Sequence, residues 1–175
     1  MEYSFVIHHI IMKTLRSILT LGLIVGAGIS AASAQNSRND KKAVKITAIK
    51  NDVDGKHYTF SANTATPLRG STIQLTSEYD LRITPDSVIS FLPYFGRAYM
   101  DVPYNPTEGG VKFSSTKFDY KVSERKKGGW EITINPKDVK NLERLVLSIS
   151  SDGYASLSVT STNRDPISFY GSLKE

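Results

Sequence analysis

The chain has 175 residues, with 22 Lys and Arg against 17 Asp and Glu (formal net charge +5), three His and no Cys. That length suits about one domain, and a composition with 39% hydrophobic and 10% aromatic residues is neither disordered, collagen-like nor membrane-like. Because Cys is absent, disulfides, thiolate nucleophiles, iron–sulfur clusters and Cys-based zinc sites are excluded.

Residues 12–34 have the pattern of a cleaved secretory signal peptide. Lys13 and Arg16 form a short basic start, an apolar run follows from Ile18 to Ile29, and Ala32-Ser33-Ala34 has the small-x-small pattern that a signal peptidase reads. As a helix the apolar run would be only about 18 Å long, too short for a bilayer core of roughly 30 Å. We therefore expect a signal peptide and no transmembrane segment.

The signal pattern contains its own Met12, so we expect translation to start there and residues 1–11 to be an upstream extension. Cleavage before Gln35 then predicts a periplasmic or secreted protein, with no lipid anchor because no Cys follows the signal. Residues 35–55 are expected to hold a flexible leader (35–42) and a first element, and residues 43–50 fit a helix or a strand. Residues 56–175 are expected to form a single β-rich domain.

From residue 57 onward, apolar and polar residues alternate with the period of β-strands. We expect strands at residues 57–62, 72–76, 79–84, 88–92, 117–122, 130–134, 145–149, 155–159 and 167–173. Trp130 heads one apolar stripe and should be buried. Asn135-Pro136 resembles an N-cap followed by a first-turn proline, which predicts a helical turn to about Leu142. Asp152-Gly153 predicts a type I′ hairpin turn, which needs positive φ at both central residues.

These elements predict an all-β fold. About nine strands with short connections favour an antiparallel meander that forms a barrel or a two-layer sandwich, with at most one or two short helices. A long irregular segment, residues 93–110, interrupts the meander.

Four stretches of the sequence resemble those of a known family. They are Ser77-Glu78-Tyr79-Asp80-Leu81-Arg82, Leu92-Pro93-Tyr94-Phe95-Gly96-Arg97-Ala98-Tyr99, Gly128-Gly129-Trp130-Glu131-Ile132 and Pro166-Ile167-Ser168-Phe169-Tyr170-Gly171. With them, the chain from about Lys56 to its end resembles the domain-of-unknown-function family 4251 of secreted proteins from Gram-negative gut bacteria. The resemblance implies a small exported β-rich domain of the periplasm or envelope. It supplies no activity and no catalytic residues.

The residues themselves offer little for catalysis, so we do not expect an enzyme. His57 is the one imidazole after the signal peptide, and no nucleophile motif accompanies it. Asp119 and Glu131 could form a carboxylate pair, but they alternate with apolar residues and should face outward as cross-strand partners of lysines. We expect no metal site and no cofactor.

One basic run, Arg125-Lys126-Lys127, precedes two glycines at a predicted hairpin tip. A solvated turn is the simplest interpretation, and export argues against a nucleic-acid partner. A weak role at an anionic membrane surface is the alternative.

The segment 93–110 is our candidate binding site. It holds Pro93, Pro103 and Pro106 together with aromatic residues, which predicts an irregular but stiff loop. Tyrosine offers an apolar ring with a polar tip and arginine a planar fork, so the candidate ligand-binding side chains are Tyr94, Arg97, Tyr99 and Tyr104. The alternative is that these aromatic residues only cap one end of the barrel or sandwich.

Three functions are compatible with this reasoning. The first is a non-catalytic binding module that holds an unknown small ligand through the loop 93–110. The second is a structural or interaction protein of the cell envelope that binds a protein partner. A hydrolytic enzyme comes third, because titratable groups are not grouped as catalysis requires.

Overall fold

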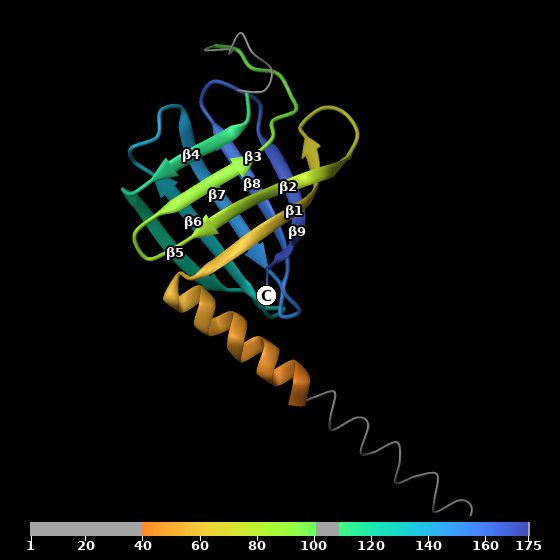
Figure 1. Ribbon diagram of the computed structural model, residues 1–175, viewed down its shortest axis with the longest axis vertical. Helices are drawn as coiled ribbons and strands as arrows, with labels where there is room; N and C mark the ends of the chain where they lie inside the picture. Colours follow the sequence, from red (N-terminus) through yellow and green to blue (C-terminus); the bar gives the residue numbers. More distant parts are fainter. Residues whose placement is uncertain (1–39, 101–108, 175) are drawn as a thin grey trace, which may run out of the picture. The chain divides into compact units, whose positions relative to one another are not determined.

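The computed structural model describes residues 40–100 and 109–174, which form one helix and nine strands (Figure 1). All of the strands belong to the compact unit that begins at residue 45. The helix spans residues 40–55. The strands are β1 (Tyr58–Pro67), β2 (Ile73–Ile83), β3 (Val88–Leu92), β4 (Val111–Ser115), β5 (Phe118–Glu124), β6 (Trp130–Pro136), β7 (Leu142–Ile149), β8 (Tyr154–Ser161) and β9 (Ile167–Leu173).

All strands belong to one antiparallel sheet with the order β4-β3-β2-β1-β9-β8-β7-β6-β5. Two meanders, β1–β4 and β5–β9, are therefore joined by the pairing of the first strand with the last. The sheet curls into a nearly closed barrel in which β4 and β5, the two end strands, are consecutive in the chain (Figure 1). The predicted all-β fold is confirmed, in its barrel form.

The core lies on the concave face of this sheet and follows the predicted alternation. Trp130, Ile132 and Ile134 of β6 are buried, as are Leu145 and Leu147 of β7. Only 5% of the Trp130 surface is exposed, as predicted. Burial of such apolar surface is the main term that stabilises a domain of this size.

The C-terminal part of the helix packs against the barrel through Ile49 and Val53, which belong to the core. The Tyr120 hydroxyl donates a hydrogen bond to the Val53 carbonyl oxygen at 3.1 Å and lies 3.0 Å from the Tyr58 hydroxyl. Burial raises the pKa of the Tyr58 phenol, so it stays protonated. Lys56, with a positive φ of 51°, ends the helix.

Residues 43–50, which fitted either a helix or a strand, belong to the helix. The helix also includes residues 40–42, which we expected in the leader. The rest of the leader and the signal peptide lie outside the described residues. Within the described part of the chain, no helix has the length and apolar character that crossing a membrane requires.

The predicted helical turn after Asn135-Pro136 is wrong. Both residues are paired in β6, Asn135 with Asp119 and Pro136 with Phe118 of β5, because the sheet offers more partners than one helical turn. The segment 137–141 is a bend instead.

This bend holds an acidic clamp on the turn between β4 and β5. The Asp138 carboxylate accepts hydrogen bonds from the Ser115 hydroxyl, from the Thr116 backbone N–H at 2.9 Å and from the Lys117 backbone N–H at 3.2 Å. These donors, the serine first, lower the pKa of Asp138 to about 2. One carboxylate thus ties the two end strands of the sheet together.

Two further strand predictions need correction. The expected strands 72–76 and 79–84 are one strand, β2, while β4 was not predicted at all. The hairpin at Asp152-Gly153 is present, but only Gly153 has a positive φ (84°), and Gly153 N–H donates to the Ser150 carbonyl. The hairpin therefore has a turn longer than the two-residue type I′ turn, with one glycine in the left-handed conformation.

Candidate functional site

Three of the four predicted site residues, Tyr94, Arg97 and Tyr99, lie in the described part of the loop. All three contact Asp165 or one another, Tyr94 and Tyr99 through their side chains and Arg97 through its backbone carbonyl. The Tyr94 hydroxyl donates to the backbone carbonyls of Arg97 (2.9 Å) and Asp165 (3.0 Å). The Tyr99 hydroxyl donates to the Asp165 carboxylate, and this bond raises the pKa of Tyr99. Tyr104 lies outside the described residues.

The turn between β8 and β9 accepts these hydrogen bonds, and its own side chains also contact the loop. The Arg164 guanidinium lies 4.8 Å from the centre of the Tyr94 ring and donates to the Gly109 carbonyl at 2.8 Å. The Asn163 side-chain amide donates to the Met100 carbonyl at 3.2 Å. Asn163 and Asp165 are buried, so their polar groups need these partners. The hydroxyl protons of Tyr94 and Tyr99 therefore hold the loop against the turn.

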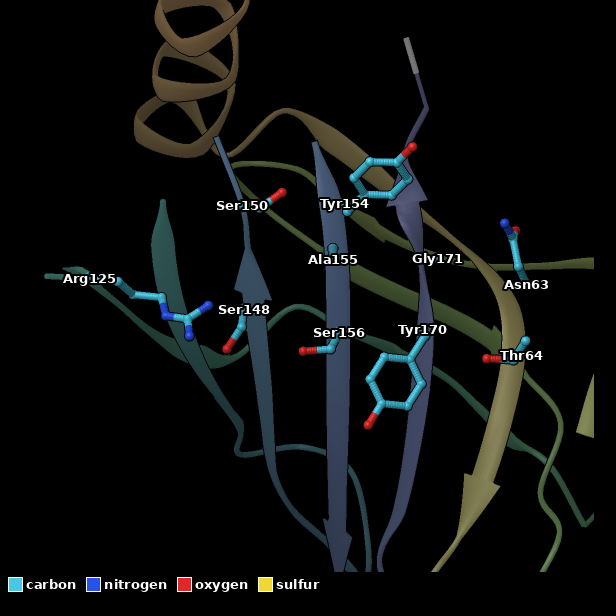
Figure 2. A pocket seen from close by; sticks show the side chains of 10 residues that line it. All are labelled: Asn63, Thr64, Arg125, Ser148, Ser150, Tyr154, Ala155, Ser156, Tyr170 and Gly171. Carbon is cyan, nitrogen blue, oxygen red and sulfur yellow. The ribbon is translucent and has the colours of Figure 1, made fainter. Parts of the chain in front are cut away.

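A different surface of the described residues carries a wide, open hollow. It is a hollow of about 460 Å³ on the outer face of the sheet, within the roughly 300–1,000 Å³ usual for ligand sites. We call it the outer groove. It crosses four adjacent strands, β7, β8, β9 and β1, and the loop between β5 and β6 lies at one end (Figure 2). Its lining consists of Asn63, Thr64, Arg125, Ser148, Ser150, Tyr154, Ala155, Ser156, Tyr170 and Gly171.

A β-bulge in β1 shapes one end of the groove. Ala62 pairs with Gly171 and Thr64 pairs with Tyr170, so Asn63 is an extra residue without a partner in β9. Ala62 and Ala65 are both buried, and the two residues between them, Asn63 and Thr64, both line the groove. A regular strand would send one of the two inward, so the bulge adds a polar side chain to the outer face.

Close approach of β1 and β9 explains the glycine opposite this bulge. A Cβ atom at position 171 would overlap the Ser61 carbonyl oxygen. The middle of the groove is low because its residues are small: Gly171, Ala155 and Ser156. The tyrosines beside them project from the sheet, and Tyr154 is 72% and Tyr170 52% exposed. Two exposed aromatic rings above a floor of small polar residues result (Figure 2).

The serines of the floor supply hydrogen-bonding groups. Ser148, Ser150 and Ser156 line the groove on neighbouring strands. The Ser150 hydroxyl oxygen is buried and has no hydrogen-bond partner among the described residues. Such a group costs about 1–3 kcal/mol when left unpaired. Because this oxygen is buried, the serine hydroxyls that the floor offers to a ligand are those of Ser148 and Ser156.

Arg125 provides the positive charge of the groove. A tight turn positions it: its backbone N–H donates to the Gly129 carbonyl at 3.0 Å, and Gly128 N–H donates back to its carbonyl at 2.9 Å. Gly128 and Gly129 have φ of 85° and 88°, which favours glycine there. Within the described part of the chain, no carboxylate forms an ion pair with Arg125.

No residue that lines the groove is a carboxylic acid, a histidine or a lysine. General acid–base catalysis uses such groups or a tyrosine phenol, and the groove has two phenols, Tyr154 and Tyr170. Among the residues that the structure describes, no three His, Asp or Glu are grouped to hold a metal ion. The arrangement can bind and orient a molecule by ring contacts, hydrogen bonds and one charge.

Comparison with known proteins agrees with the fold. Residues 40–173 match the sequence profile of a domain of unknown function, DUF4251. The chain belongs to the DUF4251 family. A crystal structure of a DUF4251 family protein from Bacteroides eggerthii is similar to it, with a TM-score of 0.53 and 17% sequence identity over 75% of this chain and 87% of that one. No curated protein matches.

The groove of this DUF4251 domain was missed by sequence reasoning. Its residues come from five separate segments, and serines on the polar side of a strand have no special pattern. The signals that could have indicated it are the tyrosines at polar positions of two neighbouring strands, Tyr154 and Tyr170, and the basic run that begins at Arg125.

Proposed function

We propose that this DUF4251 domain is an exported protein of the periplasm or envelope that acts as a non-catalytic binding module, with its ligand in the outer groove. Export is supported by the basic start, apolar run and Ala32-Ser33-Ala34 of the signal pattern. Binding is supported above all by one observation. Two exposed tyrosine rings, Tyr154 and Tyr170, flank a floor of small polar residues.

The residue types of the outer groove suit a binding surface. Tyrosine gives a large contact area at a small cost in conformational entropy, and serine and asparagine add adaptable hydrogen bonds. The groove combines these residue types with one arginine, which suits a planar or anionic group. Strands on both sides hold it, so little ordering is needed when a ligand binds.

The test is to identify what the protein carries. The full chain is expressed in its native host, purified from the periplasm and analysed by mass spectrometry for retained molecules. We expect a compound that is enriched with the wild type and lost from a Tyr154→Ala/Tyr170→Ala variant. N-terminal sequencing of the same material should begin at or near Gln35.

The control is a Phe91→Ala variant, which removes a 48% exposed ring from the outer face of β3, away from the groove. It should keep the compound. Equal retention by all three proteins would show that the groove is not the binding site.

A second candidate function, an envelope protein that binds a protein partner, is favoured by the end of the loop 93–100. Tyr99 and Met100 are 60% and 64% exposed there. Exposed apolar side chains that lie together favour contact with a partner. Cross-linking in the periplasm with a photoreactive residue at position 100 would test it, because a specific adduct at 100 and not at 91 is expected only from such a partner.

A further inference from the structure

The outer groove has a chemistry that points to one class of ligand. We propose that it binds an acidic oligosaccharide, with sugar rings on Tyr154 and Tyr170 and a carboxylate on Arg125. This inference rests on the proposed binding function and specifies its ligand.

The aromatic rings supply the first argument. Tyr154 and Tyr170 belong to neighbouring strands and lie on the same side of the sheet (Figure 2). Their exposed rings are apolar faces surrounded by hydroxyl groups. A sugar ring has the complementary surface, because its C–H groups form an apolar face while its hydroxyls point outward to hydrogen-bond partners.

The polar lining supplies the second argument. Hydroxyl and amide groups of Asn63, Thr64, Ser148 and Ser156 can each donate and accept hydrogen bonds. A ligand with hydroxyls along its whole length satisfies such a lining, whereas an acyl chain would leave it unpaired.

The sheet topology argues against a peptide. Peptides commonly bind to sheets by adding a strand to an open edge, where main-chain groups are free. The four strands under the groove are each paired on both sides, and the end strands of the sheet are β4 and β5. Recognition here must use side chains, which favours a ligand that is itself rich in hydroxyl groups.

The charge selects an acidic sugar chain over a neutral one. Arg125 lines one end of the groove, and Lys126 and Lys127 follow it in the same exposed turn. The guanidinium fork matches a carboxylate in a bidentate pair. Two acidic residues near this end lie outside the lining: Glu124 directly precedes Arg125, and Glu131 lies on β6 opposite Ser148. The three basic residues 125–127 outnumber them. The balance at this end of the groove is positive.

The experiment is a calorimetric titration of the protein, purified from cells that express the full chain, with hexagalacturonate. The matched control ligand is the methyl ester of the same oligosaccharide, which keeps the rings and removes the charges. We expect the acid to bind, and the ester to bind at least about tenfold more weakly, as expected for the loss of a charge-assisted pair.

Variants then locate the site. Tyr170→Ala should weaken binding of the acid by about tenfold or more, because it removes a ring contact. Arg125→Gln should weaken the acid by a similar factor and leave the ester unchanged. Lys126→Gln removes the same charge from the same turn but not from the lining, so at 0.15 M salt it should change affinity by less than about twofold.

Other outcomes overturn the inference. Equal binding of acid and ester would refute the role of the carboxylate, and no binding of either would refute the oligosaccharide. Binding of phosphatidylglycerol vesicles without binding of hexagalacturonate would assign the basic turn to a lipid surface instead. In each case the retention experiment above still decides the proposed function, because it depends on the groove and not on this ligand.

Discussion

Trp130 offers a direct measurement of the strand register on which the whole barrel depends. It is the one tryptophan of the chain, it heads β6, and it pairs with Glu124 on one side and Ile149 on the other. With 5% of its surface exposed, it belongs to the core. Replacement by alanine should therefore destabilise the domain strongly.

The expected magnitude follows from the buried area. An aromatic side chain buries about 150–250 Å², which at roughly 25 cal/mol per Å² corresponds to about 4–6 kcal/mol. This figure is an upper bound, because the unfolded chain already buries part of that surface. For Trp130→Ala we expect a loss of about 3–5 kcal/mol in the free energy of unfolding. At a urea m-value near 2 kcal/mol/M, the midpoint would fall by about 2 M.

Urea unfolding followed by far-UV circular dichroism measures this loss without relying on tryptophan fluorescence. Glu131→Ala is the matched control, since Glu131 is the next residue of β6 and is exposed; its effect should stay within about 0.5 kcal/mol. A slip of one residue turns every side chain of a strand to the opposite face. A loss below about 1 kcal/mol for Trp130→Ala, with a larger loss for Glu131→Ala, would refute the register of β6.

Three other changes test the contacts described above. The pKa of Asp138 is lowered from 3.8 to about 2, so its clamp stabilises the fold above pH 3.8 and that stability disappears as the pH falls to about 2. The melting temperatures of wild type and Asp138→Asn should therefore converge over this range, and a constant difference would contradict the clamp. Tyr99→Phe removes the donor to the buried Asp165 carboxylate and should lower the urea midpoint. The control Tyr154→Phe, at an exposed ring, should leave the midpoint unchanged. Equal midpoints for Tyr99→Phe and the wild type would argue against the contact. Gly171→Ala introduces a backbone overlap and should cost about 1–3 kcal/mol or more; unchanged stability by the same urea assay would mean that the bulge shifts freely.

The strands and their inward faces were predictable because they depend on a local pattern. In β6 the residues of one parity are buried throughout, in β7 they are buried from Leu145 to Ile149, and in β8 from Ala155 to Val159; that period is visible in the sequence. β4 was missed because five residues with serines at its end, Val111–Ser115, carry too little apolar alternation. Its Ser115 is buried yet polar, and the partners of its hydroxyl, the Asp138 carboxylate and the Lys117 carbonyl, lie outside the strand.

Local propensity was misleading where a distant strand decides the structure. Asn135-Pro136 has the features of a helix start, but β5 supplies partners for both residues from across the hairpin. The loop 93–100 is a related case. Its aromatic residues were recognised as special, but their partners in the turn 163–165 lie about seventy positions away, as the separations of 71 and 66 residues for Tyr94 and Tyr99 show. No pattern within the loop indicates them.

The outer groove could not be predicted for a different reason. A register shift between Ala62 and Thr64 changes which residues face outward, and no residue of β1 indicates it by itself. The glycine that makes room for the shift, Gly171, is far away in the sequence. Only the pairing of the first strand with the last brings the two together.

That pairing also explains why binding is expected outside the barrel rather than within it. The concave face carries large fully buried side chains from both meanders, among them Phe60 of β1, Leu157 of β8 and Phe169 of β9, which belong to one core cluster. Side chains that fill the interior of a small barrel leave its outer face as the surface on which recognition can evolve. On that face, the junction of β1 and β9 is where the regular pleat is interrupted by a bulge. The fold therefore provides a hollow at the pairing of its two meanders, and the tyrosines and Arg125 that line it are the residues on which the proposed function depends.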